Sequence, residues 1–440
     1  MRKPTENPQI FKQRRKKVIE SLKGSALIVA AHPEQVRNHD VQHEYRQDTN
    51  MYYLTGFEEP ESILILRPGK NPESVMFVRK KDVERETWDG FRFGPEGTKQ
   101  EFLIDAVYPI EDFATESVEL LKGFENVYYS LYKNKHVDQM VEKTLLDLRR
   151  AFGRSGYGLL SIHDADSFLG EHRLKKDETE LMNLRKACQI SAEGHVVAMK
   201  FTKPGVNERQ VQAMMAQHFY MSGSARAGYP YIIASGNNAT TLHYNFNDQT
   251  CQKGDLLLID AGAEYNYYTG DITRTFPVSG KFTEPQRKVY EGVLKIQKEI
   301  IASLKPGIFF KDLHEMGASL LTDLMLELGL VSGRKDDVMK ANQHRKYYPH
   351  GIGHWLGMDV HDAGMYMIKG EPRPVEPGMC FTIEPGLYIP GNDMTAPPEL
   401  RGIGVRIEDN VVITNQGCDV MTAAVPKEVS EIEKIVGTGV

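Results

Sequence analysis

The stretch from Leu256 to Phe276, LLLIDAGAEYNYYTGDITRTF, carries two acids whose spacing suits metal chemistry. Two apolar runs typical of strands flank a polar centre, with Asp260 in the first run and Asp271 in the second. In an antiparallel hairpin with its tip at Tyr265-Asn266, these two acids would lie directly opposite each other. Opposed Cβ atoms are ~4.5–5.5 Å apart, where two carboxylates repel unless a cation lies between them. The pair therefore indicates a metal site, although a single Asp near a turn is also a common turn former.

The segment HGIGHWLGMDVHD supplies three histidines, His350, His354 and His361. Gly351 and Gly353 argue against a helical pair of zinc ligands four residues apart. They indicate instead a loop whose backbone approaches another segment closely. We expect one histidine of this loop to bind metal.

Two more acids, Glu384 and Glu408, follow apolar runs. In CFTIEPGLY the strand ends at Glu384, because Pro385-Gly386 terminates it. In GVRIEDNVVIT, a strand predicted over Val405–Ile413, Arg406 and Glu408 alternate with apolar residues and so share one face. An arginine two residues away can hold a carboxylate by a charge-assisted hydrogen bond.

Together these residues form an ordered set of Asp, Asp, His, Glu and Glu, each on or beside a predicted strand. Four buried carboxylates would be partly protonated by desolvation and mutual repulsion unless cations neutralised them. Two divalent ions would balance their charge. Oxygen-rich ligation with a single imidazole favours Mn²⁺, while Co²⁺, Fe²⁺ or Zn²⁺ could occupy the same site.

The elements that position this set belong to the second of two expected domains, because 440 residues, 40% of them hydrophobic, exceed one ordinary core. Alternating strands and helices make residues 1–171 an α/β domain, in which an aromatic-rich strand is expected to end at Gly56. The second domain, residues 172–440, begins with a long amphipathic helix that Asp177 and Glu180 cap. Further helices are expected over Asn207–Met221, Pro285–Leu304 and Lys311–Leu328.

Charge and cysteine usage exclude several classes of partner. The formal net charge of -6, from 54 basic and 60 acidic residues, gives no footprint for nucleic acid or an anionic membrane. The four cysteines, Cys188, Cys251, Cys380 and Cys418, have no spacing typical of a disulfide framework or a zinc finger. There is no apolar run of ~18 residues. We predict a soluble cytoplasmic protein; the basic first twenty residues leave a transit peptide as an alternative.

The motifs LIDAGAEYNYYTGDITRTF, HGIGHWLG, TIEPG and RIEDN together resemble those of the Xaa-Pro aminopeptidases (aminopeptidase P), pita-bread-fold metallopeptidases related to prolidase and methionine aminopeptidase. The resemblance covers nearly the whole chain. YRQDTNMYYLTGFEEPES and ETWDGFRFGPEG resemble the amino-terminal domain of bacterial aminopeptidase P, which methionine aminopeptidase lacks. The resemblance implies an α+β pita-bread catalytic domain, a curved antiparallel sheet covered by helices. The metal ligands that it implies are Asp260, Asp271, His354, Glu384 and Glu408.

The resemblance also implies roles for residues outside the ligand set. His243, in TTLHYN, and His361 would bind substrate and shuttle protons, and His350 would lie at the edge of the site. Trp88 would reach into the pocket of a neighbouring subunit in a homo-oligomer, a dimer or tetramer. Without the resemblance, each histidine is equally a hydrogen-bonded loop residue, and Trp88 a buried or half-buried anchor of its loop.

The expected activity is hydrolysis of the bond between an N-terminal residue and a proline at position 2 of a peptide. A hydroxide bridging the two metals would attack, Glu384 would serve as general base, and His361 would help polarise the carbonyl. His243 would position or protonate the substrate, and Arg406 is counted with the catalytic residues. The nearest alternative is prolidase, which takes only dipeptides. Creatinase-like hydrolysis without metal and a non-catalytic peptide-binding module are disfavoured, because all five ligands are present.

Overall fold

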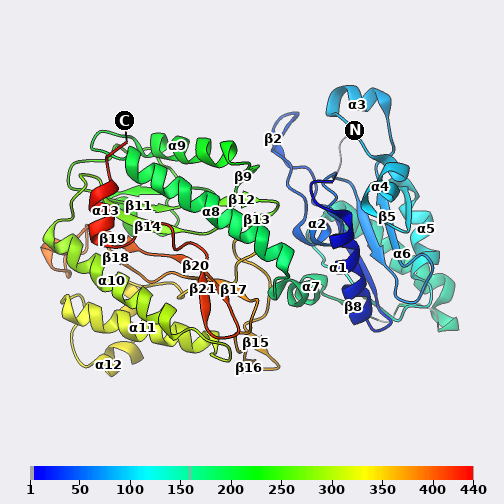
Figure 1. Ribbon diagram of the computed structural model, residues 1–440. Helices are drawn as coiled ribbons and strands as arrows, with labels where there is room; N and C mark the ends of the chain where they lie inside the picture. Colours follow the sequence, from blue (N-terminus) through cyan, green and yellow to red (C-terminus); the bar gives the residue numbers. More distant parts are fainter. Residues whose placement is uncertain (1–3, 157, 160, 440) are drawn as a thin grey trace. The chain divides into compact units, whose positions relative to one another are not determined.

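The computed structural model describes residues 4–156, 158–159 and 161–439. It forms two units, an N-terminal unit (Met1–His172) and a C-terminal unit (Arg173–Val440). Figure 1 follows the chain from the N-terminal unit in blue and cyan to the C-terminal unit in green to red. Among the described residues, no helix is both long and apolar enough to cross a membrane.

A six-stranded mixed sheet in the order β6-β5-β4-β1-β7-β8 forms the centre of the N-terminal unit. Its central strand, ALIVA, is apolar and almost wholly buried, as expected of a strand that is covered on both faces. The strands are β1 (Ala26–Ala30), β4 (Ile63–Leu66), β5 (Ser74–Val78), β6 (Ala106–Pro109), β7 (Asn126–Tyr128) and β8 (Ser161–His163), with a separate hairpin of β2 (Val36–Asn38) and β3 (Val41–Gln42). The helices are α1 (Pro8–Ser21), α2 (Thr49–Thr55), α3 (Val83–Asp89), α4 (Gly94–Phe102), α5 (Phe113–Leu121), α6 (Lys135–Phe152) and α7 (Ala165–Leu174). The predicted α/β class is confirmed.

The segment before Gly56 is a helix, α2, so the predicted aromatic strand is wrong. The Asp48 carboxylate caps the helix by accepting from the Met51 N–H at 3.0 Å. Gly56 ends it in the left-handed conformation, with φ of 67°. All seven residues of α2 are buried, so neither helical nor strand periodicity is visible in the sequence.

Short antiparallel strands and long helices make up the C-terminal unit. The strands are β9 (Arg226–Ala227), β10 (Ile232–Ser235), β11 (Leu256–Asp260), β12 (Ala263–Tyr265), β13 (Tyr268–Thr269), β14 (Thr273–Pro277), β15 (Met367–Ile368), β16 (Glu371–Pro372), β17 (Cys380–Ile383), β18 (Gly386–Ile389), β19 (Ile403–Arg406), β20 (Asp409–Ile413) and β21 (Cys418–Val420). The helices are α8 (Glu178–Phe201), α9 (Glu208–Met221), α10 (Glu284–Ser303), α11 (Phe310–Glu327), α12 (Lys335–Lys340) and α13 (Val429–Ile435). In Figure 1 the strands lie between α8 and α9 on one side and α10 and α11 on the other. This arrangement confirms the predicted antiparallel sheet covered by helices.

The helix caps in the C-terminal unit follow the sequence. Asp177 and Glu180 form the predicted capping box of α8, and Asn207 caps α9. These caps matter for the site because α8 and α9 pack on the strands that carry it.

The hairpin that carries Asp260 has a different register from the predicted one. Tyr265 pairs with Tyr268, so the tip is Asn266-Tyr267, whose φ values of 47° and 70° suit a tight two-residue turn. In the continuing β11–β14 pairing, Asp260 lies opposite Thr273. The prediction that Asp260 and Asp271 are directly opposed is therefore wrong, and they lie diagonally across the hairpin.

The predicted strand over Val405–Ile413 is broken in two. β19 ends at Arg406 and pairs with β18, whereas β20 begins at Asp409 and pairs with β17 and β21. Glu408 lies in the break. The strands on either side of Glu408 thus belong to different small sheets.

Candidate functional site

A cavity of about 610 Å³ in the C-terminal unit collects all the predicted site residues except Trp88. Its lining includes His243, Asp260, Asp271, His350, His354, His361, Glu384, Arg406 and Glu408. Trp88 lies on α3 of the N-terminal unit with 84% of its surface exposed. Its interpretation as a buried loop anchor is therefore wrong.

Asp260 and Asp271 are joined by a tyrosine that the sequence analysis did not identify. The Tyr229 hydroxyl lies 2.7 Å from Oδ1 of Asp260 and 2.5 Å from Oδ1 of Asp271. One hydroxyl proton can serve only one of these carboxylates at a time. The hydroxyl is neutral, so the repulsion between the two carboxylates has to be offset by positive charge nearby.

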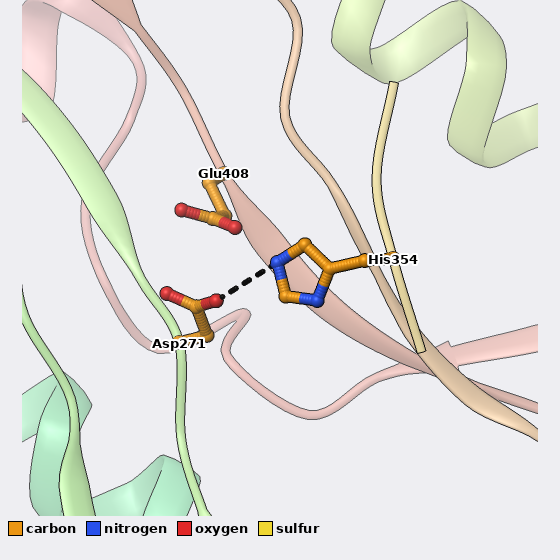
Figure 2. A group of neighbouring side chains, drawn as sticks. All are labelled: Asp271, His354 and Glu408. Carbon is orange, nitrogen blue, oxygen red and sulfur yellow. Dashed lines mark ion pairs between the residues drawn. The ribbon is translucent and has the colours of Figure 1, made fainter. Parts of the chain in front are cut away.

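Asp271, His354 and Glu408 bring one ligand atom each within 4.8 Å of one another. Figure 2 shows these side chains converging from three separate segments, with the ion pair between His354 and Asp271 dashed. The His354 Nε2 atom lies 3.3 Å from Oδ2 of Asp271. Its Nδ1 atom faces the Trp355 carbonyl oxygen at 3.0 Å, which leaves Nε2 directed at the acids.

Glu384 follows the last residue of β17, where the chain bends into β18, as the Pro-Gly pair predicts. Its Oε1 atom accepts from the Thr382 hydroxyl at 3.2 Å and lies 3.6 Å from His354 Nε2. The neighbouring loop approaches β17 closely, because a Cβ on Gly353 would lie 1.9 Å from the Thr382 carbonyl oxygen. Glycine at this position therefore allows His354 to reach the acids.

Arg406 holds Asp260 rather than Glu408, which was its expected partner. Its Nη2 atom lies 2.6 Å from Oδ2 of Asp260. The same guanidinium donates from Nε to Thr273 and from Nη1 to the Tyr388 hydroxyl, at 2.9 and 3.0 Å. The Thr273 hydroxyl in turn donates to Oε2 of Glu408 at 2.6 Å. Arg406 thus reaches Glu408 through Thr273.

The pKa values show that the acids lack sufficient positive charge. Burial raises the pKa of Glu408 well above its usual value, and Asp271 and Glu384 add to the effect. Burial, with the nearby acids, also raises the pKa of Glu384 to about 7. The pKa of Asp260 is raised by burial despite the charge of Arg406. Three of the four acids therefore disfavour ionisation in the chain alone.

His354 provides a proton in place of a further cation. Burial opposes its charged form, but the hydrogen bond and charge of Asp271 raise the pKa of His354 to about 9. The same contact lowers the pKa of Asp271 despite its burial. Bound divalent cations would displace this proton and stabilise all the carboxylates as anions. Four carboxylates and the imidazole of His354, close together in one cavity, fit such ions, since oxygen-rich sites suit hard and borderline cations.

The other three histidines line the cavity beside the acids. The His361 ring lies 4.2 Å from that of His354, edge to face. His350 hydrogen-bonds the Tyr388 hydroxyl through Nε2 at 2.8 Å, and its Nδ1 lies 3.6 Å from Oε2 of Glu384. His243 is exposed on the loop that follows β10. All three therefore border the space in front of the acids.

Asn410 fixes Asp271 from behind. Its Oδ1 atom accepts from the Asp271 backbone N–H at 2.8 Å, and its Nδ2 donates to the Asp271 carbonyl oxygen. Hydrogen bonds to the peptide groups on both sides of Asp271 leave its backbone little freedom. This clamp compensates for the absence of strand pairing at Asp271, which lies between β13 and β14.

The sequence analysis missed Tyr229 and Tyr388, which contact the acids and Arg406. Tyr388 ends the segment CFTIEPGLY, in which Glu384 was the residue singled out, and Tyr229 is 31 residues from Asp260 along the chain. The only signal for Tyr229 was a tyrosine in an apolar Gly-Tyr-Pro segment ahead of a strand. That pattern is too common to identify a site residue.

Comparison with known families covers both units. Residues 182–415 match the family model of metallopeptidase family M24. Residues 11–128 match that of the aminopeptidase P N-terminal domain. The cavity lining lies within the first match, whereas Trp88 lies within the second.

Whole-chain comparisons agree with the two family matches. The chain is 39% identical to a Xaa-Pro aminopeptidase of Haemophilus influenzae over 97% of its own length and 96% of the relative's. It is 36% identical to the Xaa-Pro aminopeptidase of Escherichia coli (strain K12), over 97% of each chain. Among solved structures, aminopeptidase PepP of Pseudomonas aeruginosa superposes with a TM-score of 0.94, at 39% identity and 98% coverage of both chains.

Proposed function

The chain belongs to the Xaa-Pro aminopeptidase branch of metallopeptidase family M24, and from this we propose that it hydrolyses the bond between an N-terminal residue and a proline at position 2. One observation carries the proposal. Three buried carboxylates, the half-buried carboxylate of Glu384 and His354 face one cavity in which Arg406 is the permanent cation among the lining residues. If these acids served only to stabilise the fold, basic side chains would balance their charge. Because one permanent cation faces four acids, the arrangement fits bound divalent cations instead.

We propose that two divalent cations are held by Asp260, Asp271, His354, Glu384 and Glu408, with Mn²⁺ preferred because oxygen ligands predominate. When bound, such a pair lowers the pKa of a water molecule and polarises a carbonyl group. The Thr273, Thr382 and Trp355 hydrogen bonds described above orient the Glu408, Glu384 and His354 side chains before any cation arrives.

Glu384 is the proposed general base. Its carboxylate lines the cavity 3.6 Å from His354 Nε2, and this position supports its acceptance of a proton from a water molecule in front of the acids. His361 lies beside His354 at the cavity wall, where its ring can donate to the oxyanion that forms on the scissile carbonyl. Arg406 holds the Asp260 carboxylate in place and opposes the effect of burial on its pKa.

The substrate preference follows from proline chemistry. An X–Pro bond has no N–H, and its leaving group is a secondary amine that must be protonated as it departs. His243 borders the cavity beside the apolar residues Leu242 and Ile232 and is the proposed donor. The free amine of the substrate would lie near Asp260, which restricts cleavage to the first bond.

We also propose that the protein is a cytoplasmic homo-oligomer, a dimer or tetramer. Trp88 is 84% exposed, which is unusual for so large an apolar side chain and supports its contact with a second subunit. All four cysteines are free, which supports a reducing compartment.

A substrate-length series tests the proposed activity. With Mn²⁺ present, we expect Arg-Pro-Pro and longer X-Pro peptides to release their first residue, and Arg-Ala-Pro to remain intact. A chelator should stop cleavage, and added Mn²⁺ should restore it. Cleavage of X-Pro dipeptides with none of Arg-Pro-Pro would contradict the proposal and identify a prolidase.

A further inference from the structure

Glu208, at the start of α9, is a fully buried carboxylate outside the cavity described above. All its hydrogen-bond donors among the described residues are neutral. Its Oε1 atom accepts from the Ser235 N–H and hydroxyl, both at 2.7 Å, and from Asn238 Nδ2 at 3.3 Å. Its Oε2 atom accepts from the Tyr244 hydroxyl at 2.8 Å and the Gln249 N–H at 3.0 Å.

The donors to Glu208 are distributed along one loop. They lie at its start (Ser235 and Asn238), in its middle (Tyr244) and at its end (Gln249), and the Glu208 N–H donates to the Gln249 carbonyl at 2.9 Å. Residues 241–249 lie outside helices and strands, so no backbone ladder orders them. Three residues of this segment, Leu242, His243 and Asn245, line the cavity.

A carboxylate in this position has a physical cost that its partners offset. A buried anion without a cation is unfavourable unless several donors solvate it. Five donors do so here, and the N-terminus of α9 adds a favourable dipole. Burial and the bond to Glu208 raise the pKa of Tyr244, so the phenol remains a donor at neutral pH. The Glu208 carboxylate thus holds several parts of the loop that follows β10 in one arrangement.

We propose that Glu208 is a positioning residue for His243: it fixes the 236–249 loop so that His243 faces the substrate. This inference rests on the proposed function, because His243 has its role there. Glu208 lies behind Tyr244, which is buried in a small cluster with Ile232, Ala239 and Tyr388. The exposed His243 side chain makes no hydrogen bond among those of the described residues, so its position follows from the loop backbone. Glu208 holds that backbone next to His243 through Tyr244. Asn247 holds it further along through Ile233 and Tyr231.

The variant Glu208→Gln tests the proposal, because the amide keeps the size of the side chain but offers a single acceptor oxygen. Either the Ser235 or the Gln249 backbone N–H then loses its partner. We expect kcat/KM for Arg-Pro-Pro to fall about 10-fold or more, with metal content unchanged. Hydrogen exchange should accelerate in residues 236–249 and stay unchanged in β11. Glu284→Gln is the matched control, the same change at the exposed first residue of α10, and should alter neither quantity.

A double-mutant cycle with His243→Ala separates positioning from a general structural role. In the His243→Ala background, Glu208→Gln should cause little further loss of kcat/KM. An equal loss in both backgrounds would overturn the proposal. If His243→Ala alone leaves kcat/KM unchanged while metal-dependent cleavage persists, the positioning proposal and the donor role of His243 fail, whereas the proposed X–Pro cleavage stands. If Glu208→Gln does not fold, Tyr244→Phe replaces it, with an expected loss of about 3-fold to 10-fold that vanishes in the His243→Ala background.

Discussion

Glu408 and Asp409 are adjacent in the chain and both buried, yet they lie in opposite electrostatic environments. Asp409 receives Arg274 Nη2 at 2.7 Å, Lys427 Nζ at 2.6 Å and Gln297 Nε2 at 2.7 Å. Glu408 receives the Thr273 hydroxyl, at 2.6 Å, and faces other acids across the cavity. The chain therefore compensates one acid completely and leaves its neighbour in need of charge.

The pKa values of the two acids diverge accordingly. Burial opposes ionisation of both, but Arg274 and Lys427 lower the pKa of Asp409 to about 2. The pKa of Glu408 is raised by burial and by Asp271 and Glu384. The difference teaches that the chain provides two basic side chains for the single acid Asp409, whereas Arg406 is the one permanent cation among the described residues that line the cavity with four acids. We interpret this shortage of positive charge around the cavity acids as the sign that cations bind there.

Glu384→Gln should have the largest effect, because it removes both a proposed ligand and the proposed base. We expect kcat/KM to fall by about 10³-fold or more, with an unchanged far-UV spectrum. Glu371→Gln, at an exposed position on β16, is the control and should retain activity. Substantial turnover by Glu384→Gln would remove this residue from both roles.

The variants Asp409→Asn and Glu408→Gln test the comparison of these two acids through their free energies of unfolding. In chelator, Asp409→Asn should lower the free energy of unfolding by about 3–5 kcal/mol, because it leaves the buried Arg274 and the half-buried Lys427 without their partner. Glu408→Gln should leave that free energy unchanged or raise it, since it removes an uncompensated acid. Urea denaturation measures both. Equal destabilisation by the two variants would break the comparison.

Added metal should reverse the order of stability of Glu408→Gln and the unsubstituted chain, so that the unsubstituted chain has the larger free energy of unfolding. At 100 times its Kd, a cation that binds only the folded state stabilises it by about 2.7 kcal/mol per site. We expect Mn²⁺ to stabilise the unsubstituted chain by this order in thermal or urea unfolding, and Glu408→Gln by much less. An Mn²⁺ effect of the same size in both would place the ion elsewhere.

Tyr229→Phe should have the smallest effect. It removes the hydroxyl shared by Asp260 and Asp271 while leaving the ring, so metal affinity should fall by about 10-fold. Titration with Mn²⁺ in a competing chelator measures the change. Tyr231→Phe, whose ring stacks on Phe219 away from the acids, is the control and should keep the affinity. An unchanged affinity in Tyr229→Phe would make this hydroxyl a bystander.

Some of the candidates could be identified from local signals, because they lie at a strand end or beside a glycine or proline that restricts the backbone. Glu384 before Pro385-Gly386 is the clearest case. The capping box of α8 was equally predictable, since Asp177 and Glu180 act over one turn. Caps and turns of this kind are determined by a few residues that are adjacent in the sequence, so they can be predicted without knowledge of the tertiary structure. His243 and His361 have no such signal and were assigned only through the family resemblance.

What the sequence did not predict depends on contacts between distant segments. The hairpin register failed because Asn266-Tyr267 and Tyr265-Asn266 both look like acceptable tips, and only pairing with β9 and β14 distinguishes them. The strand around Glu408 was predicted as continuous because its apolar alternation runs across the break. Helix α2 was missed because burial on all sides erased its periodicity.

The most direct test of the deficit in positive charge is a crystal structure of the chain grown with Mn²⁺, with an anomalous difference map at the manganese edge. We expect two anomalous peaks in the cavity. The two manganese ions should together be coordinated by Asp260, Asp271, His354, Glu384 and Glu408. A map without anomalous density there, with the Glu408 and Glu384 carboxyls still facing each other across the cavity, would contradict the account.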